Sequence, residues 1–154
     1  MKTPQEEEYV FYRFASGDMV NALSCLKSIQ RYKKYSTRHA FIFQAVLSYC
    51  RPFKSSNGKH GKYKLSKSFV PDDYMELHKE LEKFRDKVFA HTDLNVRSPV
   101  LKRWKAGNID MLPIQFKHLS PSIFNKRIAE INELVTKVMN RIDQHIDMLG
   151  SWLP

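Results

Sequence analysis

The sequence lacks several features that would place it in familiar protein classes. No stretch reaches the roughly 18 consecutive apolar residues of a membrane-spanning helix, and the acidic start, Met1 to Glu8, has no hydrophobic signal core. The only two cysteines, Cys25 and Cys50, lie in apolar segments, which favours buried thiols over a disulfide or half a metal site. We therefore expect one cytoplasmic domain over residues 1–154, with no membrane partner.

The common fingerprints of enzymes are also missing. The chain has no glycine-rich loop for phosphate, no Cys-x-x-Cys pair and no His-Glu-x-x-His sequence. His60 has no metal-ligand spacing to any other histidine or cysteine. We therefore expect no metal and no cofactor, and any catalysis should be metal-independent.

Acidic residues are absent from one long interval. The net charge is +10, and no Asp or Glu occurs between Asp18 and Asp72. The same interval holds Lys27, Arg31, Lys33, Lys34, Arg38, Arg51, Lys54, Lys59, Lys62, Lys64 and Lys67, with Tyr32, Tyr35, Phe53 and Tyr63 between them. Cations interleaved with rings that can stack on bases predict a nucleic-acid partner. The alternative is a solvated basic surface, while a membrane surface is disfavoured because no amphipathic helix accompanies the charges.

Apolar residues at spacings of three and four predict helices over most of the chain. In the first helical region, residues 5–35, the tripeptide Ser16-Gly17-Asp18 predicts a kink or a brief break, with Asp18 as a cap. Ser36 or Thr37 should cap a second helix that ends before Pro52 and forms the buried centre of a bundle.

Two segments interrupt the helical pattern. Residues 54–70 are rich in Ser, Gly and Lys and predict a long basic loop, which either closes over bound RNA or is a solvated tether. Residues 100–104 and 109–114 predict a small β-hairpin around Lys105-Ala106-Gly107-Asn108. Within it, Trp104 is interpreted as a cover for the end of the bundle in preference to a surface for stacking a base.

The last helix has the most regular apolar pattern. Ser120 and Pro121 predict its start and Gly150 its end. Its seam consists of Phe124, Ile128, Ile131, Val135, Val138, Ile142 and Leu149. The predicted fold is all-α, a four- to five-helix up-down bundle with a long basic loop and a small hairpin before the last helix.

The third helix carries the candidate catalytic pair. It should start at Asp72 or Asp73, and its apolar stripe of Tyr74, Leu77, Leu81, Phe84 and Val88 continues to His91. Arg85 lies at the edge of that stripe. An arginine can hold a phosphate and a histidine can move a proton near neutral pH. The alternative is structural, with Arg85 paired to an acid such as Glu82 and His91 capping carbonyls.

These residues resemble the signature of HEPN domains, in which an Arg is followed by a polar residue and then, after a gap of four to six residues, by a His. Here the match is Arg85-Asp86-x-x-x-x-His91, followed by Thr92-Asp93, and Tyr49-Cys50-Arg51-Pro52-Phe53 resembles a second feature of small bacterial HEPN proteins. The resemblance implies a HEPN-like bundle that forms a homodimer with a composite active site. HEPN toxins with a Tyr two positions after the His differ from this chain, which has Asp93 there.

The function implied by this resemblance is metal-independent cleavage of RNA through its own 2′-hydroxyl, in bacterial defence, toxin–antitoxin or stress response. Arg85 would hold the phosphate, His91 would act as acid or base, and Asp86 would orient one of them. The candidate RNA-binding residues are Arg51, Lys54, Lys59, Lys62, Lys64 and Lys87. For Arg51, neutralising the end of its helix is an equal alternative.

Two other functions remain open at this point. The chain could be a non-catalytic HEPN module that binds RNA or a partner such as an antitoxin or defence-system protein. It could also be a helical subunit that docks another protein through its N-terminal aromatic cluster of Tyr9, Phe11, Tyr12 and Phe14.

Overall fold

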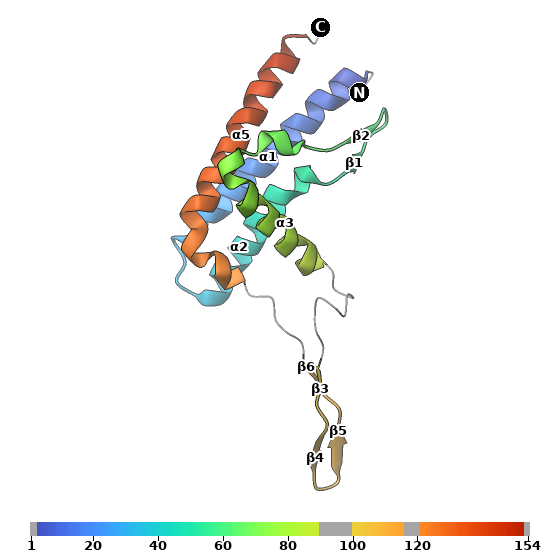
Figure 1. The fold of residues 1–154 in the computed structure, drawn as a ribbon, viewed down its shortest axis with the longest axis vertical. Coiled ribbons are helices and arrows are strands. Elements are labelled where there is room, and N and C mark those ends of the chain that lie inside the picture. Colours follow the sequence, from blue (N-terminus) through green and yellow to red (C-terminus); the bar gives the residue numbers. More distant parts are fainter. Residues whose placement is uncertain (1–2, 90–99, 116–120, 153–154) are drawn as a thin grey trace.

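The computed structural model describes residues 3–89, 100–115 and 121–152, and this part of the chain is mostly helical (Figure 1). The long helices are α1 (Pro4–Ile29), α2 (Tyr35–Cys50), α3 (Met75–Phe89) and α5 (Ile128–Gly150). α1 packs along both α2 and α5, and each of these runs antiparallel to it (Figure 1). The expected helical bundle with a few short strands is therefore confirmed.

Helix α1 is continuous, so a break of the helix at Ser16-Gly17-Asp18, with Asp18 as the cap of a second helix, is wrong. The helix begins with a capping box, in which Thr3 and Glu6 exchange hydrogen bonds between side chain and backbone. The side chains of Ser16 and Asp18 bond to distant side chains and do not act as helix caps. The Ser16 hydroxyl donates to Asp143 of α5 at 2.7 Å, and Asp18 accepts from Arg51.

Helix α2 begins two or three residues earlier than a cap at Ser36 or Thr37 predicts. Lys34 is its N-cap and makes no side-chain hydrogen bond there, so Ser36 and Thr37 lie inside the first turn. Its inward positions are buried as predicted: Ile42, Ala45, Val46, Ser48, Tyr49 and Cys50. Pro52 does end the α-helix, but the chain continues through a 3-10 turn, η1 (Arg51–Phe53). Burial raises the pKa of the Cys50 thiol, and both cysteines are free.

The segment 54–70 has more structure than the predicted loop. Strands β1 (Ser56–Asn57) and β2 (Lys62–Tyr63) pair antiparallel, and η2 (Lys67–Phe69) follows. Leu65 and Val70 are buried in the core, so the segment packs on the bundle and is not a solvated tether. It is also fixed to α1, because the Glu7 carboxylate accepts hydrogen bonds from the backbone N–H groups of Lys59 and His60.

Helix α3 is preceded by the 3-10 turn η3 (Asp72–Tyr74) with Pro71 at its cap position, so neither Asp72 nor Asp73 caps α3 itself. Leu77, Leu81 and Phe84 are buried as the apolar stripe predicts.

The predicted hairpin is present. Strand β3 (Val100–Leu101) pairs with β6 (Ile114–Gln115), and β4 (Trp104–Ala106) pairs with β5 (Ile109–Met111) in the same register. Gly107, in the connecting turn, has a φ of +56°, a conformation that favours glycine. The Trp104 side chain is 50 % exposed, so the interpretation that it covers the end of the bundle is wrong.

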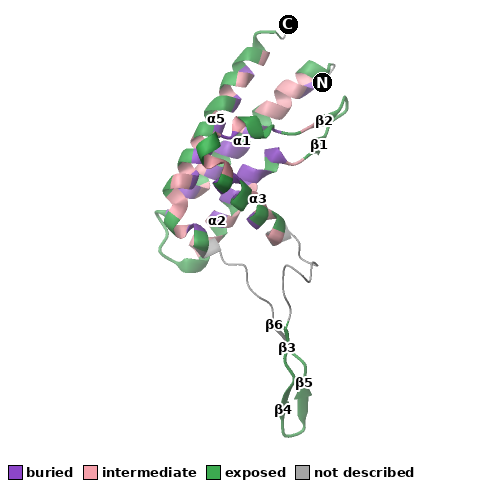
Figure 2. Cartoon of the chain, viewed as in Figure 1, coloured by how far each residue is buried: buried purple, intermediate pink, exposed green. Residues whose placement is uncertain are grey.

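Helix α5 supplies much of the core. The 3-10 turn η4 (Pro121–Arg127) precedes it, and the buried residues of α5 are Ile131, Leu134, Val135, Val138, Ile142 and Ile146. Figure 2 shows buried positions on the helix faces that meet in the bundle, whereas the hairpin is exposed. Within the described ranges, no helix combines the length and apolarity that crossing a membrane requires.

Candidate functional site

Arg85 and Asp86 lie in the last two turns of α3 and contact each other. Arg85 Nη1 is 2.8 Å from Asp86 Oδ1, and the Arg85 side chain is 26 % exposed. Phe84, one residue earlier, is buried between Phe43 of α2 and Phe124 of η4, which fixes this end of the helix. The third predicted catalytic residue, His91, lies outside the described residues.

Lys54, which follows η1, connects this pair to a second carboxylate. Its Nζ lies 3.0 Å from Asp86 Oδ2 and 4.0 Å from Glu82 Oε1. Burial pushes the pKa of Asp86 upward, but hydrogen bonds from Arg85 and Lys54 hold it below its ordinary value. Asp86 is therefore an anion at neutral pH, and it holds two of the predicted site cations close together.

A buried histidine that the sequence analysis missed lies behind this cluster. His78 is fully buried, and its Nδ1 shares a 2.9 Å hydrogen bond with the Tyr49 hydroxyl. Its Nε2 approaches Glu82 Oε2 to 3.3 Å, and Lys67 donates to the same oxygen at 2.9 Å. Burial lowers the pKa of His78 more than the Glu82 charge raises it, so the ring is neutral at pH 7.

A sequence signal for His78 did exist. The residue stands next to Leu77 and three positions before Leu81, on the buried stripe, and Glu82 follows it at i+4 on the same side of the helix. A histidine in that position needs buried hydrogen-bond partners, and only the fold shows that Tyr49 is one of them.

A cleft of about 460 Å³ lies between α1 and η1, beside Lys54. Arg51 and Lys54 line it together with the rings of Phe11 and Phe14, and Phe14 is 73 % exposed. Arg51 Nη1 donates to Asp18 Oδ1 at 2.5 Å, so Arg51 does more than neutralise a helix end. Burial raises the pKa of Asp18, although the Arg51 charge opposes that rise.

The remaining candidate RNA-binding residues lie elsewhere. Lys59, Lys62 and Lys64 are exposed on the β1–β2 segment, which packs on the acidic first turns of α1. Lys87 is half-buried near the end of α3. The structure thus brings together Arg85, Asp86 and Lys54 and places Arg51 on the neighbouring cleft. Among the described residues, no hydrogen bond or ion pair joins Lys59, Lys62 or Lys64 to this cluster.

The described residues contain no group of three His, Cys, Asp or Glu side chains that could hold a metal ion. The cluster instead contains a partly exposed guanidinium beside a lysine, and a carboxylate holds both cations in place. Guanidinium and ammonium groups bind phosphate oxygens. No protein-family model, curated protein or solved structure matches the chain.

Proposed function

We propose that this protein is a HEPN-like, metal-independent endoribonuclease. The observation that carries the proposal is the position of Arg85, which is partly exposed in the last turns of α3, is held by Asp86, and precedes His91 by six residues. Lys54, which contacts Asp86, also lines the neighbouring cleft with Arg51, and the carboxylates of Asp86 and Asp18 hold these two cations in place. The up-down arrangement of the helices agrees with a HEPN-like bundle, and this family assignment is part of the proposal.

The proposed reaction needs no group from outside the protein and the RNA. A base removes the proton of the RNA 2′-hydroxyl, and its oxygen attacks the adjacent phosphorus. The bond between phosphorus and the 5′-oxygen breaks, an acid protonates that oxygen, and the products are a 2′,3′-cyclic phosphate and a 5′-hydroxyl. Arg85 stabilises the charge on the phosphoryl oxygens, and His91 transfers the protons.

One chain supplies one His91, whereas the reaction uses both a base and an acid. A symmetric homodimer that places two copies of Arg85 and His91 in one groove supplies both, because a two-fold interface duplicates every residue near its axis. The proposed setting is bacterial defence, a toxin–antitoxin pair or a stress response, in which an antitoxin or defence protein controls the activity.

One observation favours a second candidate, a non-catalytic HEPN-like module that binds RNA or a partner protein. Both Arg85 and Lys54 are engaged by the Asp86 carboxylate. A binding module needs such a fixed charged cluster but needs no proton transfer at His91.

The test is incubation of the purified chain with mixed RNA in excess chelator. Arg85→Ala and His91→Ala are compared with wild type and with Lys83→Ala, an exposed lysine on the same helix. We expect cyclic-phosphate and 5′-hydroxyl ends from wild type and Lys83→Ala, and a loss of about 100-fold or more in the other two variants. Absence of such ends with wild type, or equal cleavage by all variants, refutes the ribonuclease assignment, and retained RNA binding then selects the second candidate.

A further inference from the structure

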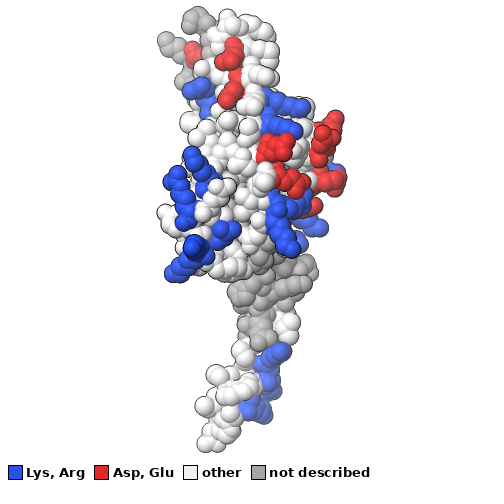
Figure 3. All heavy atoms as spheres, turned by 90° about the vertical axis from the view of Figure 1, so that its left-hand side faces the viewer, with Lys and Arg blue, Asp and Glu red and all other residues white. Residues whose placement is uncertain are grey.

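The turn between α1 and α2 concentrates cations that have no acidic partner in the described part of the chain. Arg31, Lys33 and Lys34 are exposed, and none of them forms an ion pair with a described residue. On the face shown in Figure 3, Lys and Arg side chains gather along one edge of the bundle without Asp or Glu among them. The local potential there is positive, so an anionic partner would gain free energy without displacing a carboxylate.

Two tyrosines stand among these cations. Tyr32 is 47 % exposed, and its ring stacks on Phe41 with centroids 5.3 Å apart, so the protein supports one face of the ring. Tyr35 is 61 % exposed and lies 3.7 Å from the His39 ring. A supported, exposed ring is a stacking platform for an unpaired base.

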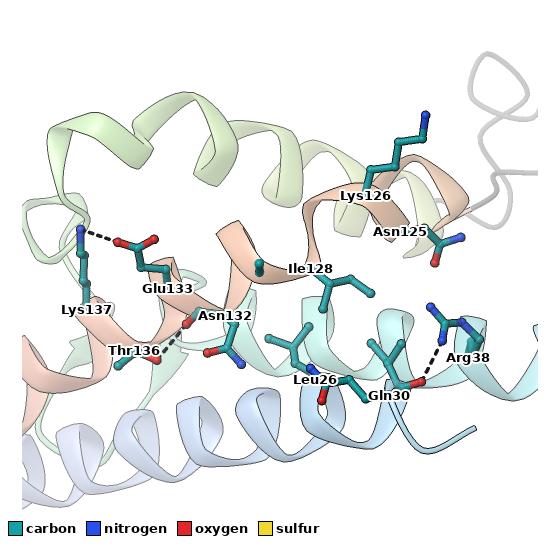
Figure 4. Close-up of a pocket in the computed structure, with 12 residues that line it drawn as sticks. Leu26, Gln30, Arg38, Asn125, Lys126, Ile128, Asn132, Glu133, Thr136 and Lys137 are labelled. Atoms are coloured by element: carbon teal, nitrogen blue, oxygen red, sulfur yellow. Dashed lines mark hydrogen bonds and ion pairs between the residues drawn. The ribbon is translucent and has the colours of Figure 1, made fainter. Parts of the chain in front are cut away.

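A groove of about 840 Å³ adjoins the turn, between the end of α1 and the start of α5 (Figure 4). Arg38 Nη1 donates to the Ile29 carbonyl at 2.9 Å, which fixes the guanidinium at one end of the groove, near Asn125. Asn125 Oδ1 is buried and has no hydrogen-bond partner among the described residues. A buried acceptor is normally paired, and this one belongs to a side chain that lines the groove.

The same end of the groove is close to the candidate active site. Asn125 and Lys126, which line it, follow Phe124, and the Phe124 ring packs edge-on against Phe84 at 5.1 Å. Arg85 is the next residue after Phe84. η4 thus lines the groove and also packs against the end of α3.

We infer that the α1–α2 turn and the adjoining groove form a binding surface for single-stranded RNA. The cations of the turn contact phosphates, Tyr32 and Tyr35 stack on bases, and the groove takes a base or nucleotide. The inference rests on the proposed function in one respect, that the ligand is RNA. Single strands are favoured over duplexes because stacking and contacts to base edges both require unpaired bases.

The test measures binding separately from cleavage. A fluorescent 2′-O-methyl oligonucleotide of about 12 residues has no free 2′-hydroxyl, so the proposed reaction cannot cleave it. Its affinity is measured by anisotropy over a range of salt concentrations. For the triple variant Arg31→Gln, Lys33→Gln, Lys34→Gln, we expect affinity roughly 100-fold lower at about 0.1 M salt, and a slope of log K against log salt smaller by about 2.

The matched control removes the same charge elsewhere, from exposed lysines outside both surfaces: Lys79→Gln, Lys83→Gln, Lys105→Gln. It should weaken binding less than about fivefold, since distant charges are screened. Tyr35→Leu should weaken binding roughly tenfold with an unchanged salt slope. Circular dichroism and thermal melting establish that each variant is folded.

Several results would overturn the inference: no binding by wild type, wild-type affinity in the turn variant, or equal losses in the turn variant and the control. Loss of binding only on changing Lys59, Lys62 and Lys64 would move the site to the β1–β2 segment. Binding of the modified oligonucleotide without cleavage of ordinary RNA refutes the ribonuclease proposal and leaves this surface in place.

Discussion

Replacing Tyr49 by phenylalanine removes one buried hydroxyl and keeps the ring that packs 5.4 Å from Phe53. The hydroxyl makes the 2.9 Å hydrogen bond to Nδ1 of His78, and both residues are fully buried. The variant therefore leaves a polar nitrogen in the core without its partner and with no access to water.

The expected cost follows from that geometry. A typical hydrogen bond contributes about 1 kcal/mol net, but an orphaned buried polar group costs about 1–3 kcal/mol. We expect the free energy of unfolding to fall by about 1–3 kcal/mol. For a chain of this size, that corresponds to a melting temperature lower by about 2–12 °C. Urea unfolding should show a lower midpoint with an unchanged m-value.

Tyr32→Phe is the control, because that hydroxyl lies on a half-exposed side chain and its loss should change stability by less than about 0.5 kcal/mol. If Tyr49→Phe unfolds at the wild-type midpoint, the hydrogen bond to His78 does not contribute to stability, and the interior network described above is wrong.

The same network predicts a dependence on pH. Burial lowers the pKa of His78, while Glu82 opposes this and Lys67 and Lys54 add to it. Below about pH 6.5, the ordinary value for histidine, the unfolded chain binds a proton that the folded chain does not. Stability contributed by neutral His78 is therefore present above that pH and is lost as the pH falls toward the folded pKa, by at most about 1.4 kcal/mol per pH unit.

This loss is measured by urea unfolding at about pH 7.5 and about pH 5.5. His78→Gln cannot titrate, so its stability should fall less than that of wild type over this interval, whatever its absolute value. Equal changes in the two proteins would show that His78 titrates alike in the folded and unfolded states.

Three further substitutions test the packing of α1. Gly58→Ala would place a Cβ only 2.5 Å from Glu7 Oε1, so thermal unfolding should show a loss of about 1–3 kcal/mol. Gly17→Ala is its counterpart within the unbroken helix, where nothing lies within 4 Å of the added Cβ, and urea unfolding should show a gain of about 0.5–1 kcal/mol. A loss in Gly17→Ala would contradict a regular helix there. Asp18→Asn keeps an acceptor for Arg51 and removes a partly buried charge, so the free energy of unfolding measured in urea should change by less than about 1 kcal/mol.

The secondary-structure elements that depend on residues close together in the sequence were predicted from that sequence. The seam of α5 follows from apolar residues at helical spacing, and Gly150 was predicted as its end, which the structure confirms. The hairpin was predicted from two apolar runs separated by Lys105-Ala106-Gly107-Asn108. In the structure Lys105 and Ala106 belong to β4, and the turn is shorter, with Gly107 at positive φ.

The features that were missed depend on contacts between distant parts of the chain. Ser16-Gly17-Asp18 has the composition of a helix break, yet Ser16 bonds a residue 127 positions away and Asp18 one 33 positions away. His78 takes its role from Tyr49, 29 positions earlier. The sequence located Arg85 and Asp86 in one motif, but it gave no sign that Lys54 would join them, since that contact spans 32 positions.

A sequence alone cannot rank its lysines by how much each contributes to phosphate binding. Lysines of the long interval without acids look equivalent in sequence, but the fold sorts them by their partners. Lys54 binds Asp86, so a phosphate that reaches Lys54 must displace a carboxylate or remain close to it, and the repulsion offsets the attraction. Lys33 and Lys34 have no such competitor among the described residues. Phosphate contacts at the α1–α2 turn should therefore provide binding free energy, while the Lys54–Asp86–Arg85 cluster fixes the position of the guanidinium.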